Sequence, residues 1–199
     1  EACRSRNTQA NHDDAVRRIV ALRSEWEQET AEVFASAAIP IRPERLLREI
    51  SDRATAETLV VTDASYVTGW AMSHIDTRGN GVGQISPRGT GGIGWGLPAA
   101  IGAKLAAPSR PVICVTGDGG FGYVLSELET AARYGVNVVV VVFNNGTLGF
   151  QKHYEEKLFG TYVDCDFAPV NYAEIAKAMS CKGERITDPA AIGPAIDRA

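Results

Sequence analysis

Two runs of apolar, mostly β-branched residues constrain the fold of this chain more than any other feature. The first covers residues 111–116, and the second covers residues 137–143, where valine fills most positions. Runs of this kind are typical of strands whose two faces are both covered in a parallel sheet, so we expect the second strand to be buried on both faces. Residues 121–134 leave room for one crossover helix between the two runs. This part of the chain therefore predicts a βαβ unit.

The rest of the chain also alternates between helical and strand-like segments. The fold class that this pattern predicts is α/β, a doubly wound parallel sheet with helices on both faces. A long amphipathic helix is expected over residues 13–38, with Asp13 and Asp14 in its first turn. Its apolar face would pack either on another domain or on the domain to which the helix belongs. Pro43 suits the first turn of a second helix. The remaining expected elements are strands at 58–62, 83–86 and 182–186, and helices at 44–54, 66–74, 97–106, 172–180 and 190–198. Residues 146–154 are expected to form either a short helix or a mobile segment.

Charge and composition exclude several classes of partner. Lys and Arg total 20 against 24 Asp and Glu, a net charge of −4, so a surface for nucleic acid is not expected. The longest apolar stretch, residues 136–143, is too short to span a membrane. The four cysteines (Cys3, Cys114, Cys165 and Cys181) have no CxxC spacing. We expect reduced thiols and a cytoplasmic protein, with Cys114 in the core.

Residues with metal-binding chemistry follow the two apolar runs. Gly117-Asp118-Gly119 ends the first run and Asn144-Asn145 ends the second. Because ligands of parallel sheets bind outside the carboxyl ends of the strands, Asp118 and Asn145 are expected to lie together. Hard oxygen ligands suit Mg²⁺ that holds a diphosphate. Gly119 and Gly120 would let backbone N–H groups reach the diphosphate where the next helix begins.

This arrangement resembles the motif of thiamine-diphosphate (ThDP) enzymes, in which GDG is followed by a spacer in the mid-twenties and then NN. Residues 88–104 resemble the glycine-rich turn and helix found upstream of GDG in acetolactate synthases and related 2-oxo acid decarboxylases. The resemblance covers roughly residues 41–187. It implies the C-terminal, diphosphate-binding domain of that superfamily.

The resemblance implies a role for particular residues. Asp118 and Asn145 would bind Mg²⁺ together with the backbone carbonyl of Thr147. Ile93 would be the apolar wedge that bends the cofactor, although many acetolactate synthases have Met there. The backbone carbonyl of Gly91 would accept a hydrogen bond from the cofactor's 4′-amino group.

Two further positions follow from the resemblance with departures from the family pattern. Ser65 would lie by the diphosphate, but residues 63–66 lack the usual glycine-rich sequence, and the Asp63 carboxylate would repel phosphates unless it is turned away. His153, next to Lys152, lies in the segment that closes over the substrate and is a candidate for holding a substrate carboxylate or moving protons. Tyr154 replaces the Trp that acetolactate synthases typically have.

The resemblance also implies an activity and partners. It is that of a ThDP- and Mg²⁺-dependent carboligase or decarboxylase of 2-oxo acids, similar to acetolactate synthase. Benzoylformate decarboxylase-like and 2-hydroxyacyl-CoA lyase-like activities are the alternatives. Residues 1–40 would be a linker helix from a missing middle domain, where any FAD would bind. Residues 41–199 would form the ThDP domain without its final strand. The activating glutamate would come from the pyrimidine-binding domain of a neighbouring subunit in a homodimer or homotetramer, so the isolated fragment would be inactive.

A dinucleotide-binding dehydrogenase is the rival interpretation. Residues 117–122 also satisfy the GxGxxG pattern after a strand. That pattern requires an acidic residue at the end of the next strand to bind ribose. Phe143, Asn144 and Asn145 occupy this place, and the glycine-rich block at residues 91–96 would have no role.

Overall fold

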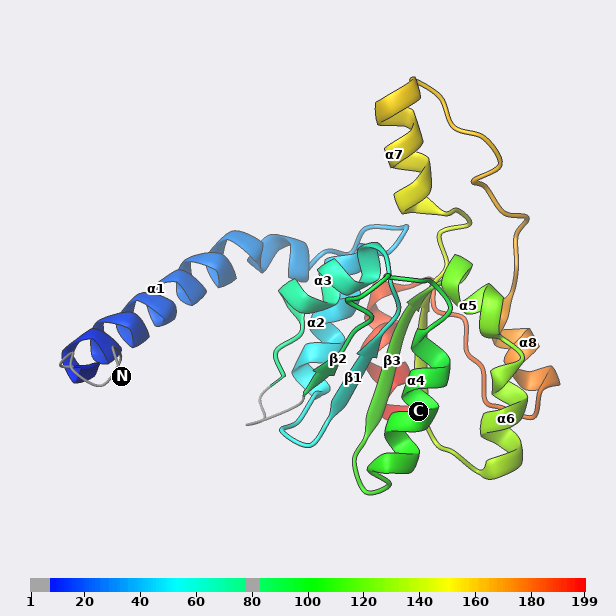
Figure 1. Cartoon of the computed structure of the whole chain (residues 1–199), viewed down its shortest axis with the longest axis horizontal. Helices are drawn as coiled ribbons and strands as arrows, with labels where there is room; N and C mark the ends of the chain where they lie inside the picture. Colours follow the sequence, from blue (N-terminus) through cyan, green and yellow to red (C-terminus); the bar gives the residue numbers. More distant parts are fainter. Residues whose placement is uncertain (1–7, 78–82) are drawn as a thin grey trace. The chain divides into compact units, whose positions relative to one another are not determined.

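A computed structural model describes residues 8–77 and 83–199 of the chain (Figure 1). In chain order, its elements are α1 (Thr8–Phe34), α2 (Pro43–Arg53), β1 (Leu59–Thr62), α3 (Tyr66–His74), β2 (Gln84–Ile85), α4 (Gly96–Ala106), β3 (Val112–Gly117), α5 (Asp118–Val124), α6 (Glu127–Tyr134), β4 (Val139–Phe143), α7 (Gly149–Phe159), α8 (Tyr172–Ala178), the 3-10 turn η1 (Pro189–Ala191) and α9 (Ile192–Arg198). Within these described residues, no helix is both long and apolar enough to cross a membrane.

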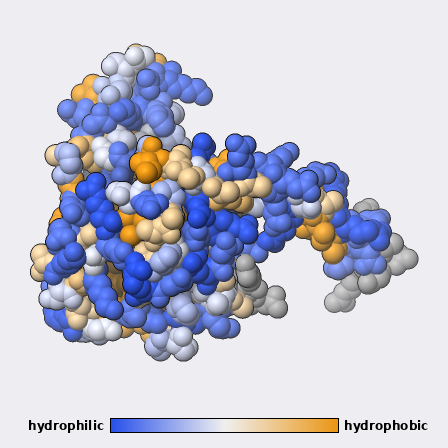
Figure 2. Space-filling view, turned by 180° about the vertical axis from the view of Figure 1, so that it is seen from behind, coloured by the Kyte–Doolittle hydropathy of each residue, from blue (hydrophilic) through white to orange (hydrophobic). Residues whose placement is uncertain are grey.

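The chain divides into two compact units, residues 1–36 and 37–199. The first unit contains α1, which begins at Thr8, so Asp13 and Asp14 do not lie in its first turn as expected. The sequence pattern did not indicate this earlier beginning, because the first residues of the helix are mostly polar and carry no apolar periodicity. Val16 and Ile19 are exposed, and Figure 2 shows apolar side chains among hydrophilic ones along this helix.

The second unit is built on a four-stranded parallel sheet with the order β2-β1-β3-β4. This confirms the predicted α/β fold with a parallel sheet. The chain moves from β1 to one side to form β2 and then returns to the other side to form β3. The order therefore reverses between β1 and β3, and the crevice outside the carboxyl ends of these two strands is where ligands of open α/β sheets bind.

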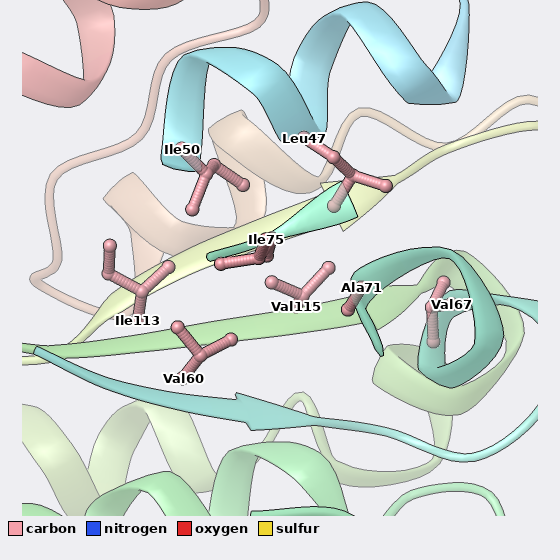
Figure 3. Close-up of a cluster of buried hydrophobic side chains, with 8 residues drawn as sticks. All are labelled: Leu47, Ile50, Val60, Val67, Ala71, Ile75, Ile113 and Val115. Atoms are coloured by element: carbon pink, nitrogen blue, oxygen red, sulfur yellow. The ribbon is translucent and has the colours of Figure 1, made fainter. Parts of the chain in front are cut away.

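One face of the sheet is covered by α2, α3 and α9. Pro43 occupies the first turn of α2, as predicted, where its fixed φ suits the helix. Leu47 and Ile50 of α2 pack with Val60 of β1 and Val115 of β3 (Figure 3). Together these residues form a buried apolar cluster whose members are Leu47, Ile50, Val60, Val67, Ala71, Ile75, Ile113 and Val115.

The opposite face is covered by α4, α6 and α8. Alternate residues of the strands point here, as the two-residue period of a strand requires. Cys114 of β3 is fully buried on this face with Ala100 of α4, which confirms its expected place in the core. Leu97, Phe121 and Leu128 belong to a second cluster on the same face.

Burial of β4 differs from the expectation. All five of its residues are partly exposed, whereas five of the six residues of β3 are buried. In the part of the chain that the structure describes, β4 pairs only with β3 and lies at the edge of the sheet. Val139 and Val141 pack on one layer of helices, while Val138 and Val140 pack on the other. The apolar residues of β4 thus indicate correctly that helices cover both faces of the strand, but they do not indicate that one of its edges is unpaired.

Two expected elements are different in the structure. The crossover between β3 and β4 contains two helices, α5 and α6, because the chain bends at Leu125 and Ser126. Residues 182–186 are described and form no strand. They run against α8 instead of the sheet, so closely that a Cβ on Gly183 would lie 2.1 Å from the carbonyl oxygen of Ala173.

Candidate functional site

Four turns meet at the carboxyl ends of the strands. They follow β1 at Asp63, lead into α4 at residues 91–96, join β3 to α5 at residues 117–120 and follow β4 at residues 144–148. Hydrogen bonds join the first turn to the second, and the third to the fourth. The residues singled out by the sequence motif therefore come together at the edge where it predicted them.

Asp118 connects the two halves of the motif. Its side chain is nearly inaccessible, at 2% exposure. Oδ1 accepts a hydrogen bond from the Gly119 amide at 2.9 Å, and Oδ2 accepts one from the Gly146 amide at 2.5 Å. Burial raises the pKa of the Asp118 carboxyl, while these amide donors oppose the rise. A cation beside this carboxylate would compensate for the lost hydration of its charge.

The two asparagines after β4 have different environments. Asn144 donates from Nδ2 to the carbonyl of Val170 at 2.9 Å and so ties the strand end to a distant segment. Asn145 is exposed, and its Oδ1 accepts from the Thr147 amide at 3.2 Å. Asn145 directly precedes Gly146, whose amide donates to Asp118, whereas the Asn144 side chain is engaged with the distant Val170 carbonyl. This difference favours Asn145 over Asn144 as a metal ligand.

Thr147 is held in place by a segment far along the chain. Its hydroxyl donates to the Cys165 carbonyl at 3.0 Å, and Thr147 forms an isolated antiparallel bridge with Asp166. The Leu148 amide donates to the same Cys165 carbonyl at 2.8 Å. The Thr147 carbonyl, the predicted third ligand, accepts from the Gly149 amide at 2.9 Å and keeps a second lone pair.

These oxygens fit Mg²⁺. A carboxylate has about four acceptor positions, and two hydrogen bonds leave capacity on Asp118. A carboxylate, a carboxamide and a backbone carbonyl are hard ligands that leave positions for phosphate oxygens and water. Among the described residues, no group of three or more His, Cys, Asp or Glu could hold a metal ion. A metal ion at this edge would therefore need a mixed set of side-chain and backbone oxygens.

The glycine-rich turn borders a hollow. Pro87 and residues 89–95 line a volume of about 430 Å³. Ile93 is 38% exposed, so its side chain does not fill the core. Gly91 has a φ of 66°, and a Cβ added to it would meet no described atom within 4 Å. The turn thus presents an apolar side chain and open backbone to the hollow, as a surface for a cofactor requires.

Asp63 is the residue at this edge whose structural role sequence reasoning missed. It is 1% exposed, and its carboxylate accepts hydrogen bonds from the amides of Gly94 and Gly96 and from the hydroxyl of Thr116. The carboxylate is therefore turned into the protein, which answers the expected repulsion of phosphates. Nothing in residues 63–66 signalled this, because the three donors lie far along the chain.

Ser65 has an unusual backbone conformation. Its φ of 79° and ψ of −155° belong to a region populated almost only by glycine. The residue is exposed at the start of α3, and within the described residues its side chain makes no capping hydrogen bond to that helix. Its predicted place by a diphosphate stays a prediction.

Helix α7 carries His153 and Lys152. Figure 1 shows it projecting beyond the end of the sheet, and none of its residues, all of which the structure describes, is buried. His153 Nδ1 lies 3.2 Å from the Tyr66 hydroxyl of α3. The Lys152 ammonium pairs with Asp166 at 2.7 Å and lies over the Tyr162 ring. Both side chains thus have partners within the chain, and the predicted role of His153 is not tested by this geometry.

Comparison with known proteins decides the family. Residues 63–199 match the model of the family described as thiamine pyrophosphate enzyme, C-terminal TPP binding domain. The chain belongs to this family. Membership confirms the resemblance, supports ThDP as the cofactor and removes the dinucleotide-binding interpretation of residues 117–122.

Curated relatives refine this result. The acetolactate synthase large subunit IlvG of Mycobacterium tuberculosis is 38% identical over 81% of this chain and 29% of the relative. The sulfoacetaldehyde acetyltransferase of Alcaligenes xylosoxydans xylosoxydans is 32% identical over 80% of this chain and 26% of the relative. The acetolactate synthase large subunit of Parasynechococcus marenigrum is 32% identical over 82% of this chain and 26% of the relative. The chain thus spans less than a third of the length of these relatives.

Proposed function

We propose that this chain is the diphosphate- and Mg²⁺-binding part of a ThDP enzyme that acts on 2-oxo acids in an acetolactate-synthase-like carboligation. The observation that carries this proposal is the 2.5 Å hydrogen bond between the Gly146 amide and Asp118 Oδ2. It brings the GDG and NN turns into direct contact in a chain that belongs to the ThDP family. The names of the acetolactate synthase relatives support the reaction.

Each proposed ligand has a defined position. Asp118, Asn145 and the carbonyl of Thr147 would bind Mg²⁺, which in turn would bind the diphosphate. The amides of Gly119 and Gly120, in the first turn of α5, would bind the diphosphate, and the Gly119 amide would give up its hydrogen bond to Asp118 Oδ1 to do so. Ser65, at the start of α3, would complete the diphosphate site.

The glycine-rich turn would set the conformation of the cofactor. Ile93 would support it from below as an exposed apolar wedge, and the Gly91 carbonyl would accept a hydrogen bond from the aminopyrimidine. When bound, ThDP supplies the carbon nucleophile and the electron sink that decarboxylation of a 2-oxo acid requires. The protein supplies the bent conformation and the position. His153 on α7 would act at the substrate, either on its carboxylate or in proton transfer.

The other half of the site would come from outside these residues. We infer that residues 1–40 link to a middle domain, that residues 41–199 form the ThDP domain, and that a neighbouring subunit of a homodimer or homotetramer contributes the pyrimidine-binding domain with its glutamate. The share of the relatives' length that this chain covers supports this inference. The 199-residue chain alone should then release no CO₂ from 2-oxo acids above background.

A product assay tests the proposed function. The full-length protein is incubated with pyruvate, ThDP and Mg²⁺, and both CO₂ and acetolactate are measured. Acetolactate that appears only when both ThDP and Mg²⁺ are present is the expected result. CO₂ release with an aldehyde as the only product would instead indicate a simple decarboxylase, and turnover that requires added sulfoacetaldehyde would favour the activity named for the acetyltransferase relative. Binding of NADH without binding of ThDP would refute the proposal.

A further inference from the structure

Asp63 has a bonding pattern that no ligand role explains. It directly follows β1, and its backbone amide still donates to the Val115 carbonyl of β3 at 2.8 Å. The side chain then turns inward and is 1% exposed. A carboxylate with so little exposure is stable only if its oxygens are paired with donors. The identity of these donors shows what the residue does.

Two of the donors are backbone amides of the glycine-rich turn that leads into α4, and the third is a side-chain hydroxyl near the end of β3. The Gly94 amide lies 3.1 Å from Oδ1 and 3.2 Å from Oδ2 of Asp63. The Gly96 amide donates to Oδ2 at 3.3 Å, and the Thr116 hydroxyl donates to Oδ2 at 3.1 Å. The single carboxylate therefore joins the glycine-rich turn to the ends of both β1 and β3.

Close packing of glycines fixes the same arrangement. A Cβ on Gly96 would lie 3.1 Å from the Cβ of Asp63, and a Cβ on Gly120 would lie 2.8 Å from its Oδ2. A Cβ on Gly94 would lie 3.1 Å from the Cβ of Tyr123 in α5. The glycine-rich turn, Asp63 and the turn after β3 thus meet with no room for side chains between them.

We propose that Asp63 is a positioning residue that sets the place of the Gly91 and Ile93 turn relative to the Asp118 turn. The inference rests on the proposed function, because it assigns the two turns to the two ends of one cofactor. Gly94 and Gly96 follow Ile93 by one and three positions, so hydrogen bonds to their amides restrain the wedge directly. Asp63 itself touches no ligand.

The chemistry of the carboxylate explains why its amide would not replace it. An ionised carboxylate is an acceptor at both oxygens, whereas the Asn side chain has one acceptor oxygen and a donor NH₂ group. In Asp63→Asn, an NH₂ group in the place of Oδ2 would face the Gly96 amide and the Thr116 hydroxyl, and one in the place of Oδ1 would face the Ala64 and Gly94 amides. The shape is kept while the restraint is lost.

Hydrogen exchange of the cofactor-free full-length protein tests the restraint. In Asp63→Asn, the amides of Gly94 and Gly96 should exchange about tenfold faster than in the wild type, as expected for the loss of a hydrogen bond to a charged acceptor. Val61→Ala is the matched control, because it weakens the core in the same strand, where Val61 is fully buried, without touching the turn. The control should have a lower free energy of unfolding. In it, the amides of Gly94 and Gly96 should exchange no faster than global unfolding of the same variant allows.

Turnover is the second measurement. At saturating ThDP and Mg²⁺, Asp63→Asn should lower kcat about tenfold, a positioning effect, while the Kd of ThDP changes about threefold or less. If Asp63→Asn does not fold, Thr116→Val provides the same test, since it removes one donor to Oδ2 and keeps the side-chain shape. Its effects should have the same direction and a smaller size, about threefold.

Several results would overturn the inference. If the amides of Gly94 and Gly96 exchange at the wild-type rate in both Asp63→Asn and Thr116→Val, the proposed restraint does not exist. If Val61→Ala loses as much protection at these amides, Asp63 only contributes to general stability. Unchanged kcat in a variant with faster exchange would show that the restraint does not reach the reaction. A wild-type protein that binds no ThDP would instead refute the proposed function, and this inference with it.

Discussion

Asp63 and Asp118 occupy equivalent places, directly after neighbouring strands, yet they differ in what their carboxylates bind. Both are almost inaccessible, with exposures of 1% and 2%. Asp118 accepts hydrogen bonds from amides of its own turn and of the turn after β4. Asp63 accepts from the glycine-rich turn and from Thr116. Two buried carboxylates at one sheet edge therefore have different partners, which agrees with the proposed roles of Asp118 as a metal ligand and of Asp63 as a residue that holds the protein's own turns.

The difference also appears in how completely each charge is compensated. Asp63 has donors from three separate residues at distance in the sequence, in addition to its neighbour Ala64. Asp118 has fewer, and burial raises the pKa of its carboxyl despite them. A carboxylate whose hydration is only partly replaced is a better place for a cation than one that is fully paired.

The largest expected effect concerns Asp63. Asp63→Ala would leave the Gly94 and Gly96 amides and the Thr116 hydroxyl without an acceptor. We expect the free energy of unfolding to fall by about 3 kcal/mol or more, since each unpaired buried donor is costly. Urea denaturation measures this change. Asp52→Ala on α2, where Asp52 pairs with Arg48 at the surface, is the matched control and should change it by less than about 0.5 kcal/mol. Equal losses in the two variants would contradict the role of Asp63.

The complementary prediction concerns Asp118. Asp118→Ala should lower the affinity for ThDP in the presence of Mg²⁺ about 100-fold, because it removes the charged ligand, while the protein stays folded. Isothermal titration calorimetry of the full-length protein measures the affinity. Asp52→Ala again serves as the control and should bind as the wild type does. Unchanged affinity in Asp118→Ala would show that this carboxylate is not a metal ligand.

Adjacent glycines provide a sharper version of the contrast. A Cβ on Gly120 would meet the Asp63 carboxylate at 2.8 Å, whereas a Cβ on Gly119 would meet the terminal Cδ2 of Leu148 at 2.6 Å. The Leu148 side chain can move aside, but the carboxylate is fixed by its hydrogen bonds. Gly120→Ala should thus destabilise the protein by about 2 kcal/mol, and Gly119→Ala by less. Thermal unfolding of the cofactor-free protein compares them, and a larger loss in Gly119→Ala would refute the rigidity assigned to Asp63.

Ile93 tests what the turn held by Asp63 contributes to the reaction. Ile93→Ala should lower turnover at saturating ThDP about tenfold and leave the affinity for ThDP nearly unchanged, because the wedge acts on conformation and the diphosphate end provides the anchoring. This is the reverse of the result expected for Asp118→Ala. Steady-state kinetics and calorimetry on one preparation separate the two quantities. A loss confined to affinity would make Ile93 a simple contact residue.

The smallest effect is expected for an exposed carboxylate, Asp197 of α9. Its hydrogen bond with the Arg53 guanidinium, 2.7 Å from Oδ1, lowers the pKa of the Asp197 carboxyl. A lowered pKa in the folded state means that the stabilisation is present above the ordinary value of about 3.9 and is lost as the pH falls through the lowered pKa. Asp197→Asn should therefore be slightly less stable than the wild type at pH 7. Urea titrations at pH 7 and near pH 3 should show this difference shrinking in acid; a constant difference would exclude the ion pair as its source.

Sequence patterns that depend on neighbouring positions predicted much of the fold. The run at residues 111–116 gave β3 within one residue, and Pro43 marked the start of α2. The helix at residues 13–38 was recognised, but its beginning was not, because polar residues can start a helix without any apolar signal. The open edge at β4 could not be predicted either, since apolar residues report covered faces alone.

The candidate site divides in the same way. Asp118 and Asn145 were found because their spacing forms a motif that combines residue type with strand position. Asp63 was not, because its donors lie 31 to 53 residues away and have no fixed spacing. The bond between Tyr66 and His153, 87 residues apart, was hidden for the same reason. Contacts between turns become visible only when the sheet order brings the strand ends together.

The partly exposed strand β4 makes the sheet extensible. An edge strand offers a row of backbone donors and acceptors to any further strand. A strand added there in the parallel direction would end beside Asn144 and Asn145, as β3 ends beside β1. Growth of the sheet at this edge would thus place new backbone beside the proposed ligand Asn145, so that one event would change both the sheet and the surroundings of the candidate site.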